Sequence, residues 1–187
     1  IVMINDVLQE TKDRMGKSEK AFQKELSKVR TGRASQAILD GVVVDYYGAV
    51  TPLSQMATVS IPESRLITVK PWDVSVINDV EKAILKANLG LTPSNDGKLI
   101  RISIPPLTEE RRKEIVKTVA KTCEDYKVAI RNIRRDSNEM LKELQKDGDI
   151  SEDDSFKGQK MVQDATDASI KKLDAIFAEK EKEILEV

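Results

Sequence analysis

Positively charged side chains concentrate in residues 111–135, and the chemistry they offer is the recognition of phosphate. The segment holds nine lysines and arginines against three acidic residues, a local net charge of +6. Guanidinium groups form paired hydrogen bonds to phosphate oxygens and can stack on unpaired bases, while lysines add compact point charges. The nine cations are Arg111, Arg112, Lys113, Lys117, Lys121, Lys127, Arg131, Arg134 and Arg135. This segment therefore favours RNA or another polyanion as a ligand.

Helical spacing would place seven of these cations on one face. On a wheel of about 100° per residue they share an arc of roughly 140°, with the apolar residues on the far side. Only Glu124 intrudes on the arc, so we expect the cations to face outward. The seven are Lys113, Lys117, Lys121, Lys127, Arg131, Arg134 and Arg135. The alternative is an ordinary solvated helix face, although such a face usually mixes charges of both signs.

The composition excludes several kinds of catalytic and metal-binding chemistry. The 187 residues include no histidine and a single cysteine, Cys123. Without histidine there can be no Ser-His-Asp or Cys-His nucleophile, no His-based metal site and no imidazole acid–base catalyst. One cysteine cannot close an internal disulfide or build a Cys-rich zinc site, which favours a reducing, cytoplasmic setting. We expect no enzymatic activity, no cofactor and no metal, and we expect Cys123 to be a small core residue.

Two short motifs resemble functional sites but have simpler explanations. Gly16-Lys17-Ser18 looks like the end of a phosphate-binding loop, yet Thr11 stands where such a loop needs its first glycine. Glu152-Asp153-Asp154 could hold a cation, but acidic residues are also favoured at the start of a helix by its dipole. Neither motif is interpreted as a site.

Long helices are needed to carry the cations, and apolar spacing predicts three of them. The first runs from Asn5, a candidate N-cap, to about Arg30. The second follows Thr108 as a cap and reaches Gly148, and the third starts at Ser151. The apolar seam of the second helix comprises Ile115, Val119, Tyr126, Ile130, Ile133, Met140 and Leu144.

The residues between the first two helices have a different pattern. Residues 31–105 contain β-branched runs at 42–47, 57–61, 66–69 and 99–104, punctuated by Gly, Pro and Asn-Asp-Gly turns, with one helical stretch at about 74–89. They predict a small α/β domain. We expect its aromatic residues to pack within the domain rather than form a base-stacking platform; they are Tyr46, Tyr47 and Trp72.

Together these elements predict an α+β fold in which a long three-helix bundle is interrupted by the smaller domain. Residues 1–30 and 106–187 would form the discontinuous bundle, because their apolar stripes can only be buried against one another. Two chain crossings, at 30–33 and 104–107, would join the domains as a two-stranded hinge.

The near-neutral net charge of −1 is a cancellation. Residues 136–187 hold eight basic and fifteen acidic residues, a local charge of −7, which offsets the +6 of residues 111–135. No run of 18 apolar residues or signal-peptide pattern is present, so we expect a soluble protein that is not exported. Ile1 and Val2 stand ahead of Met3, which indicates that Met3 is the native start or that the leading pair is a remnant of added sequence.

Four segments, in this order along the chain, resemble signature segments of the bacterial ribosome recycling factor family. They are Arg30-Thr31-Gly32-Arg33-Ala34-Ser35, Asp45-Tyr46-Tyr47-Gly48, residues 105–113 from Pro105 to Lys113, and Arg131-Asn132-Ile133-Arg134-Arg135-Asp136. The resemblance extends from Met3 to the C-terminus. It implies an L-shaped molecule of tRNA-like dimensions that binds the post-termination ribosome and, with elongation factor G and its GTP hydrolysis, splits the subunits.

The resemblance also implies roles for individual residues. It places Arg131, Arg134 and Arg135 at a contact with large-subunit ribosomal RNA near the intersubunit bridges, with Arg134 the most sensitive. Lys117, Lys121 and Lys127 are added from the helical wheel. The hinge would comprise Arg30, Thr31, Gly32, Arg33, Pro105 and Pro106. We expect a cytoplasmic monomer with no membrane partner; the alternative is a coiled-coil adaptor that binds other proteins rather than ribosomes.

Overall fold

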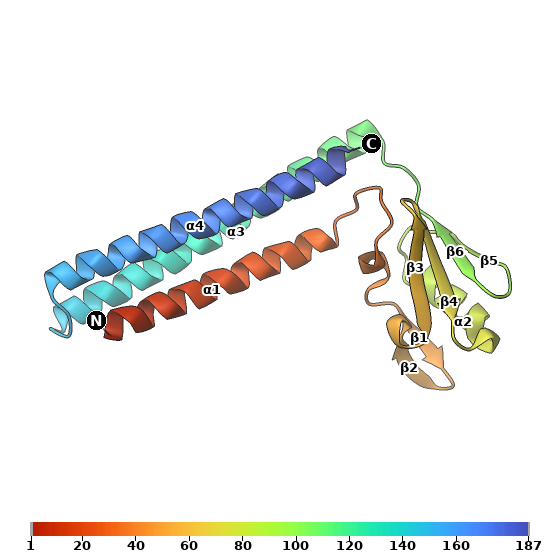
Figure 1. The fold of residues 1–187 in the computed structure, drawn as a ribbon, viewed down its shortest axis with the longest axis horizontal. Helices are drawn as coiled ribbons and strands as arrows, with labels where there is room; N and C mark the ends of the chain where they lie inside the picture. The colour runs from red at the N-terminus through yellow and green to blue at the C-terminus, as the bar shows by residue number, and fades with distance from the viewer. Residues whose placement is uncertain (1, 187) are drawn as a thin grey trace. The chain divides into compact units, whose positions relative to one another are not determined.

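The fold consists of two compact units. The computed structural model describes residues 2–186, with side chains from Met3 onward, and Figure 1 shows its helices and strands. One unit comprises Ile1–Val29 and Glu110–Val187, and the other comprises Arg30–Glu109. The first is helical and the second contains the strands. The predicted fold class, a three-helix bundle with an inserted smaller α/β domain, is confirmed.

The first unit, called the bundle below, is built from three long helices that lie alongside one another (Figure 1). The Thr11 and Ser137 hydroxyls form a hydrogen bond at 2.5 Å, and the Tyr126 hydroxyl donates to Glu25 at 2.7 Å. Because the later residue of the first helix contacts the earlier residue of the second, these two helices are antiparallel. The helices are α1 (Val2–Ser27), α3 (Glu109–Lys146) and α4 (Glu152–Leu185).

Apolar side chains at three- and four-residue spacings fill the bundle interior. Phe22, Ile130 and Leu173 have no exposed surface, and burying a side chain of this size contributes about 1.5–3 kcal/mol. The Phe22 ring also contacts that of Tyr126, with 5.2 Å between centroids. A further cluster lies near the α3–α4 connection and comprises Ile4, Val7, Leu141, Ile150 and Val162.

Two predictions about the helices are confirmed. Ser151 caps α4, because its side chain accepts the backbone N–H of Asp154 at 3.0 Å. Cys123 is a core residue with 4% of its surface exposed.

Two others are wrong. α1 begins at Val2, so Asn5 lies inside the helix and is not its cap. Met140 is 39% exposed and Leu141 takes its place in the core. The reason is that a straight helix turns in 3.6 residues, so a strict seven-residue repeat drifts away from the buried face.

The smaller unit contains a four-stranded antiparallel sheet in the order β3-β4-β6-β5 and a separate hairpin, β1-β2. One α-helix, α2 (Ile77–Lys86), buries Ile77, Val80 and Ile84. The strands are β1 (Val43–Tyr46), β2 (Ala49–Pro52), β3 (Ala57–Glu63), β4 (Leu66–Pro71), β5 (Pro93–Asn95) and β6 (Ile100–Ser103).

Short strands and capped turns account for the differences from the predicted small domain. The pattern did not predict β2 or β5, which have four and three residues and each contain a proline. The helix is also shorter than predicted, because a separate 3₁₀ turn (Val74–Val76) precedes it. That turn is capped by Asp73, whose carboxylate accepts the Ser75 N–H at 3.0 Å.

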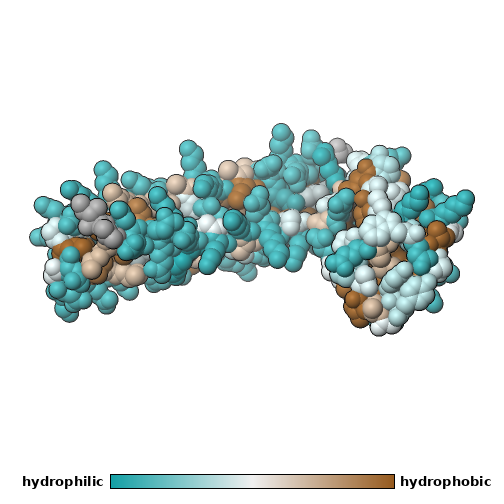
Figure 2. Space-filling view, turned by 60° about the horizontal axis from the view of Figure 1, so that its bottom comes forward, coloured by the Kyte–Doolittle hydropathy of each residue, from teal (hydrophilic) through white to brown (hydrophobic). Residues whose placement is uncertain are grey.

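The aromatic residues of this unit do not all lie in its core. Tyr46 lies against the apolar core, as predicted, but Tyr47 and Trp72 are 74% and 66% exposed. Tyr47 occupies the turn between β1 and β2 with a φ of 49°, and its hydroxyl donates to Asp73 at 3.1 Å. Tyr47 and Trp72 both still contact residues of this unit: the Tyr47 ring centroid lies 4.7 Å from that of Tyr46, and Nε1 of Trp72 donates to Thr58 at 2.9 Å. The three residues therefore pack within the domain as predicted, but two of them do so at its surface rather than in its core. Figure 2 shows hydrophobic residues at the surface of this unit, whereas the visible bundle surface is mainly hydrophilic.

Candidate nucleic-acid interface

The predicted cationic residues all lie on α3, which positions them through its buried seam. Ile115, Val119, Ile130 and Ile133 are buried on one side of the helix. The cations follow at the complementary spacings, so most of them project away from that side. We call Lys113, Lys117, Lys121, Lys127, Arg131, Arg134 and Arg135 the α3 cationic face.

Four members of this face are exposed to solvent, Lys113, Lys117, Lys121 and Arg135. Within the described part of the chain, none of Lys117, Lys121 and Arg135 forms an ion pair. A cation without a carboxylate partner needs no bond broken before it meets a phosphate. These three side chains are therefore available for an anionic ligand.

Arg131 forms an ion pair at the surface of its own helix. Its Nη1 lies 3.0 Å from Oε1 of Glu124, with 37% and 56% of the two side chains exposed. Glu124 is the one acidic residue that the wheel placed within the arc. Exposed pairs of this kind contribute about 0.2–1 kcal/mol, so the guanidinium can exchange this partner for a phosphate at small cost.

Arg134 extends from α3 over the neighbouring helix α4. Its Nη1 donates to Oε1 of Gln163 at 3.4 Å, and the Gln163 amide donates onward to Asp167 at 2.8 Å. The side chain is half-buried. This contact holds the guanidinium beside α4, with further N–H groups left to donate.

Lys127 differs from the other cations because it packs against α4. Its Nζ lies 2.5 Å from Oδ1 of Asp174, and only 19% of its side chain is exposed. The hydrogen bond to Asp174 raises the pKa of Lys127 above its usual value. The expectation that this lysine faces outward is therefore wrong, since its charge is already occupied within the bundle.

The two chain crossings between the units are anchored to one turn of the smaller unit. The N–H of Ala34 donates to the Ser64 carbonyl at 2.7 Å, and the N–H of Ile104 donates to the Arg65 carbonyl at 2.8 Å. The predicted hinge residues adjoin these anchors: residues 30–33 precede Ala34, and Pro105 and Pro106 follow Ile104. Arg30, Arg33, Pro105 and Pro106 are exposed, Thr31 is half-buried and Gly32 is buried.

Gly32 has a backbone conformation that other residues avoid. Its φ is 79°, and a Cβ atom there would lie 3.6 Å from Cγ of Leu107. The contact distance is ordinary, so the requirement for glycine comes from the left-handed φ. Both crossings thus meet beside this glycine, within the smaller unit.

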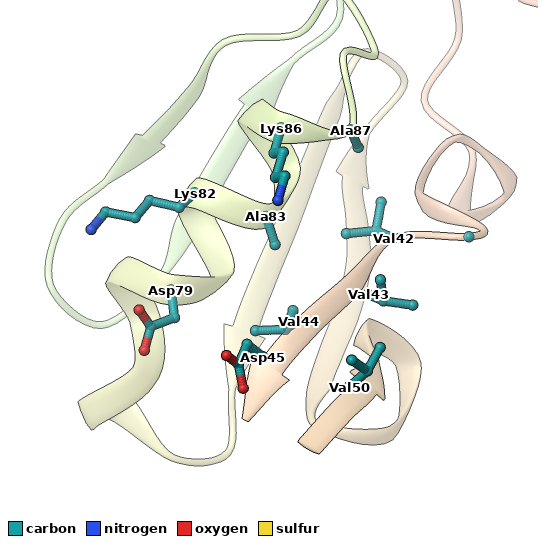
Figure 3. A pocket seen from close by; sticks show the side chains of 11 residues that line it. Val42, Val43, Val44, Asp45, Val50, Asp79, Lys82, Ala83, Lys86 and Ala87 are labelled. Carbon is teal, nitrogen blue, oxygen red and sulfur yellow. The ribbon is translucent and has the colours of Figure 1, made fainter. Parts of the chain in front are cut away.

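A pocket of about 490 Å³ lies between the β1-β2 hairpin and α2 (Figure 3). Valines of the hairpin form one side, and α2 forms the other. Its charged residues are Asp45, Asp79, Lys82 and Lys86. Asp45 is engaged by the Gly48 N–H at 2.9 Å, and no cysteine, serine or histidine lines the pocket. The sequence pattern did not predict it, because the hairpin partner β2 was missed.

The described residues provide no other centre for chemistry. Among residues 2–186 no group of three or more Cys, Asp or Glu side chains is placed to hold a metal ion. In the same range no helix has the length and apolarity needed to cross a membrane. The α3 cationic face and the two crossings remain the features with functional potential.

Comparison with known proteins identifies close relatives. The sequence model of the ribosome recycling factor family matches residues 22–185. The ribosome-recycling factor of Desulforapulum autotrophicum is 69% identical over 185 residues, covering 99% of this chain and 100% of that protein. The ribosome-recycling factor of Bacillus velezensis is 54% identical over 185 residues, with the same coverage.

Solved structures show the same similarity. A solution structure of a ribosome recycling factor has a TM-score of 0.81 and 37% identity, covering 100% of both chains. A second structure has a TM-score of 0.65 and 44% identity, covering 97% of this chain and 98% of the other. It represents the T. thermophilus ribosome recycling factor and E. coli elongation factor G bound to the E. coli post-termination complex.

Proposed function

Because this chain belongs to the ribosome recycling factor family, we propose that it binds the post-termination ribosome in the cytoplasm and, with elongation factor G, splits the subunits for reuse. GTP hydrolysis by elongation factor G supplies the energy, and this chain performs no bond chemistry itself. The presence of a relative beside elongation factor G on a post-termination complex supports this proposal. It acts as a monomer.

The α3 cationic face, apart from Lys127, anchors the protein on large-subunit ribosomal RNA. The observation that carries this assignment is the one-sided concentration of cations, with Lys117, Lys121 and Arg135 unpaired and exposed among the described residues. Arg131 and Arg134 add guanidinium forks held only by weak partners, at 3.0 and 3.4 Å. Phosphate contacts of this kind give binding through charge and shape rather than base sequence.

The smaller unit moves about the two crossings while the bundle stays anchored. Both crossings are short, and both are tied to the Ser64-Arg65 turn, so a force on the smaller unit acts on the bundle through these two strands. Pro105 and Pro106 restrict the backbone angle φ in the second crossing. Paired connections of this type allow rotation over a limited range.

The anchor is tested by replacing Arg134 and Arg135 with Ala, separately and together. We expect ribosome binding, measured by sedimentation, to weaken by about tenfold or more for the double variant, because two phosphate contacts are lost. Lys160→Ala is the matched control, since Lys160 is an exposed bundle cation on α4 outside this face. Equal binding and equal subunit splitting by all variants would remove the anchor assignment.

The hinge is tested by replacing Pro105 and Pro106 with glycine. The change removes the φ restriction without altering charge, so ribosome binding should stay unchanged while subunit splitting slows. Splitting is followed by light scattering with elongation factor G and GTP. A normal splitting rate with normal binding would contradict a mechanical role for this strand.

A further inference from the structure

The outward face of α1 changes the sign of its charge at Gly16. On a wheel of about 100° per residue, three carboxylates before Gly16 and four lysines after it lie within an arc of roughly 80°. The charged residues within this arc are all acidic on one side of Gly16 and all lysines on the other. The residues are Asp6, Glu10 and Asp13, followed by Lys17, Lys20, Lys24 and Lys28. We call the four lysines the α1 lysine stripe.

The stripe points away from the other two helices. Thr11 and Glu25 contact α3, and Glu19 contacts Ser169 of α4 at 2.7 Å. The stripe occupies the remaining sector of α1, and all four lysines are exposed. Lys28 lies one residue beyond α1, where its N–H bonds to the Glu25 carbonyl at 3.3 Å and continues the turn.

The four lysines are free of the contacts that occupy other bundle cations. Within the described residues none of them takes part in an ion pair. Arg14, by contrast, pairs with Asp136 at 3.0 Å. The positive charge of the stripe is therefore presented to solvent without compensation.

The surface charge of α1 changes sign at the same position along the bundle axis as the surface charge of α3. The Arg14–Asp136 pair joins the two helices where α3 passes from the cationic Arg135 to the acidic segment that begins with Asp136. Further along, Glu25 contacts Tyr126. The lysines of α1 therefore lie beside the cationic part of α3, and one lengthwise section of the bundle is positive on two helices.

The two cationic surfaces nevertheless face different directions. The α3 cationic face leans toward α4, as shown by the contacts of Lys127 with Asp174 and of Arg134 with Gln163. The α1 stripe points away from both partners of α1. One flat anionic surface cannot cover both, so each requires its own ligand segment.

We propose that the α1 lysine stripe binds the phosphate backbone of a second ribosomal RNA segment, separate from the one that contacts α3. The inference rests on the proposed ribosomal function. RNA is favoured over a protein partner because the stripe offers only point charges, with the exposed Ala21 and Gln23 on either side of it. Protein interfaces depend on buried aromatic or aliphatic anchors, whereas phosphate backbones are bound by unpaired cations alone.

The test compares two fourfold variants of the full-length protein. One replaces Lys17, Lys20, Lys24 and Lys28 with Ala. The matched control replaces four exposed bundle lysines from the opposite, acidic section, Lys142, Lys146, Lys157 and Lys160, and so removes the same charge. Binding to 70S ribosomes is measured by sedimentation across a salt series. We expect the stripe variant to lower the log–log salt slope by about 3, the value for four lost phosphate contacts, and the control variant to change it by less than about 1.

The outcomes separate this inference from the proposed function. If the Arg134 and Arg135 variants weaken binding while the stripe variant retains the wild-type slope, the inference is overturned and the function stands. If the wild-type protein does not bind ribosomes, both fall. Carbodiimide joins lysines to carboxylates but not to phosphodiesters, so a cross-link from a stripe lysine to a ribosomal protein would also overturn the RNA assignment.

Discussion

Lys127 and Asp174 join α3 to α4 through an ion pair in which Nζ lies 2.5 Å from Oδ1. With 19% of its side chain exposed, Lys127 is shielded from solvent, whereas Lys121, six residues earlier on the same helix, is exposed. Two lysines that the wheel assigned to one face thus have different environments. One stabilises the bundle, and the other is open to a ligand.

This difference gives a paired prediction for Lys127→Ala and Lys121→Ala. We expect Lys127→Ala to lower the free energy of unfolding by about 1 kcal/mol, because it removes an ion pair and the packing of the lysine stem. Lys121→Ala should change it by less than about 0.5 kcal/mol but should weaken ribosome binding. Urea unfolding and ribosome sedimentation measure the two effects. The reverse pattern would contradict the assignment.

Gly16 and Gly158 are both helical glycines, yet alanine should act on them in opposite directions. A Cβ at Gly16 would meet no atom within 4 Å, so Gly16→Ala should stabilise the protein by about 0.5–1 kcal/mol through helix propensity. A Cβ at Gly158 would lie 3.0 Å from both Cδ atoms of Leu141 and 3.4 Å from Ile4. Overpacking costs about 1–3 kcal/mol, so Gly158→Ala should destabilise the protein. Thermal unfolding of the two variants provides the comparison, and equal shifts of one sign would show that α4 can move away from Leu141.

The hydroxyls of Thr11 and Ser137 form a buried polar contact between α1 and α3. Thr11 donates to the Val7 carbonyl at 2.7 Å, so Ser137 donates to Thr11. Thr11→Val removes that acceptor and should cost about 1–2 kcal/mol, because the buried Ser137 hydroxyl loses its partner. The double variant Thr11→Val, Ser137→Ala should cost less than the sum of the single changes. Additive effects in urea unfolding would mean that the two hydroxyls are not coupled.

The bundle was predictable because periodic apolar residues fix helices and their buried faces. Ser151 and Cys123 were predicted correctly for this reason. Met140 was wrongly placed in the core, because the seven-residue repeat used for the prediction drifts from the 3.6 residues per turn of the helix, which places Leu141 inward instead. The smaller unit was less predictable: β2 and β5 are held by their partner strands rather than by their own composition.

For the candidate site, the wheel located the cations but not the acidic partner of Lys127, because Asp174 lies 47 residues away in sequence and only the packing of α3 on α4 brings it close. The lysine stripe of α1 has a sequence signal, the unmixed charges on either side of Gly16.

The Asp96 carboxylate in the β5-β6 turn provides a prediction for pH. Its pKa is lowered to about 2, first by the backbone N–H of Lys98, then by the Arg101 guanidinium and the N–H of Leu99. Oδ1 accepts the two N–H groups at 2.9 and 2.8 Å, and Oδ2 lies 2.6 Å from Arg101. The ionised form is favoured by folding, so its stabilising effect is fully present above the ordinary pKa of 3.8 and is lost as the pH falls through about 2.

Asp96→Asn can keep the backbone contacts but loses the ion pair. We therefore expect the variant to have a lower midpoint of thermal unfolding than the wild type at pH 6, with the difference shrinking between pH 4 and pH 2. A difference that stays constant over that range would mean that the charge on Asp96 does not stabilise the turn.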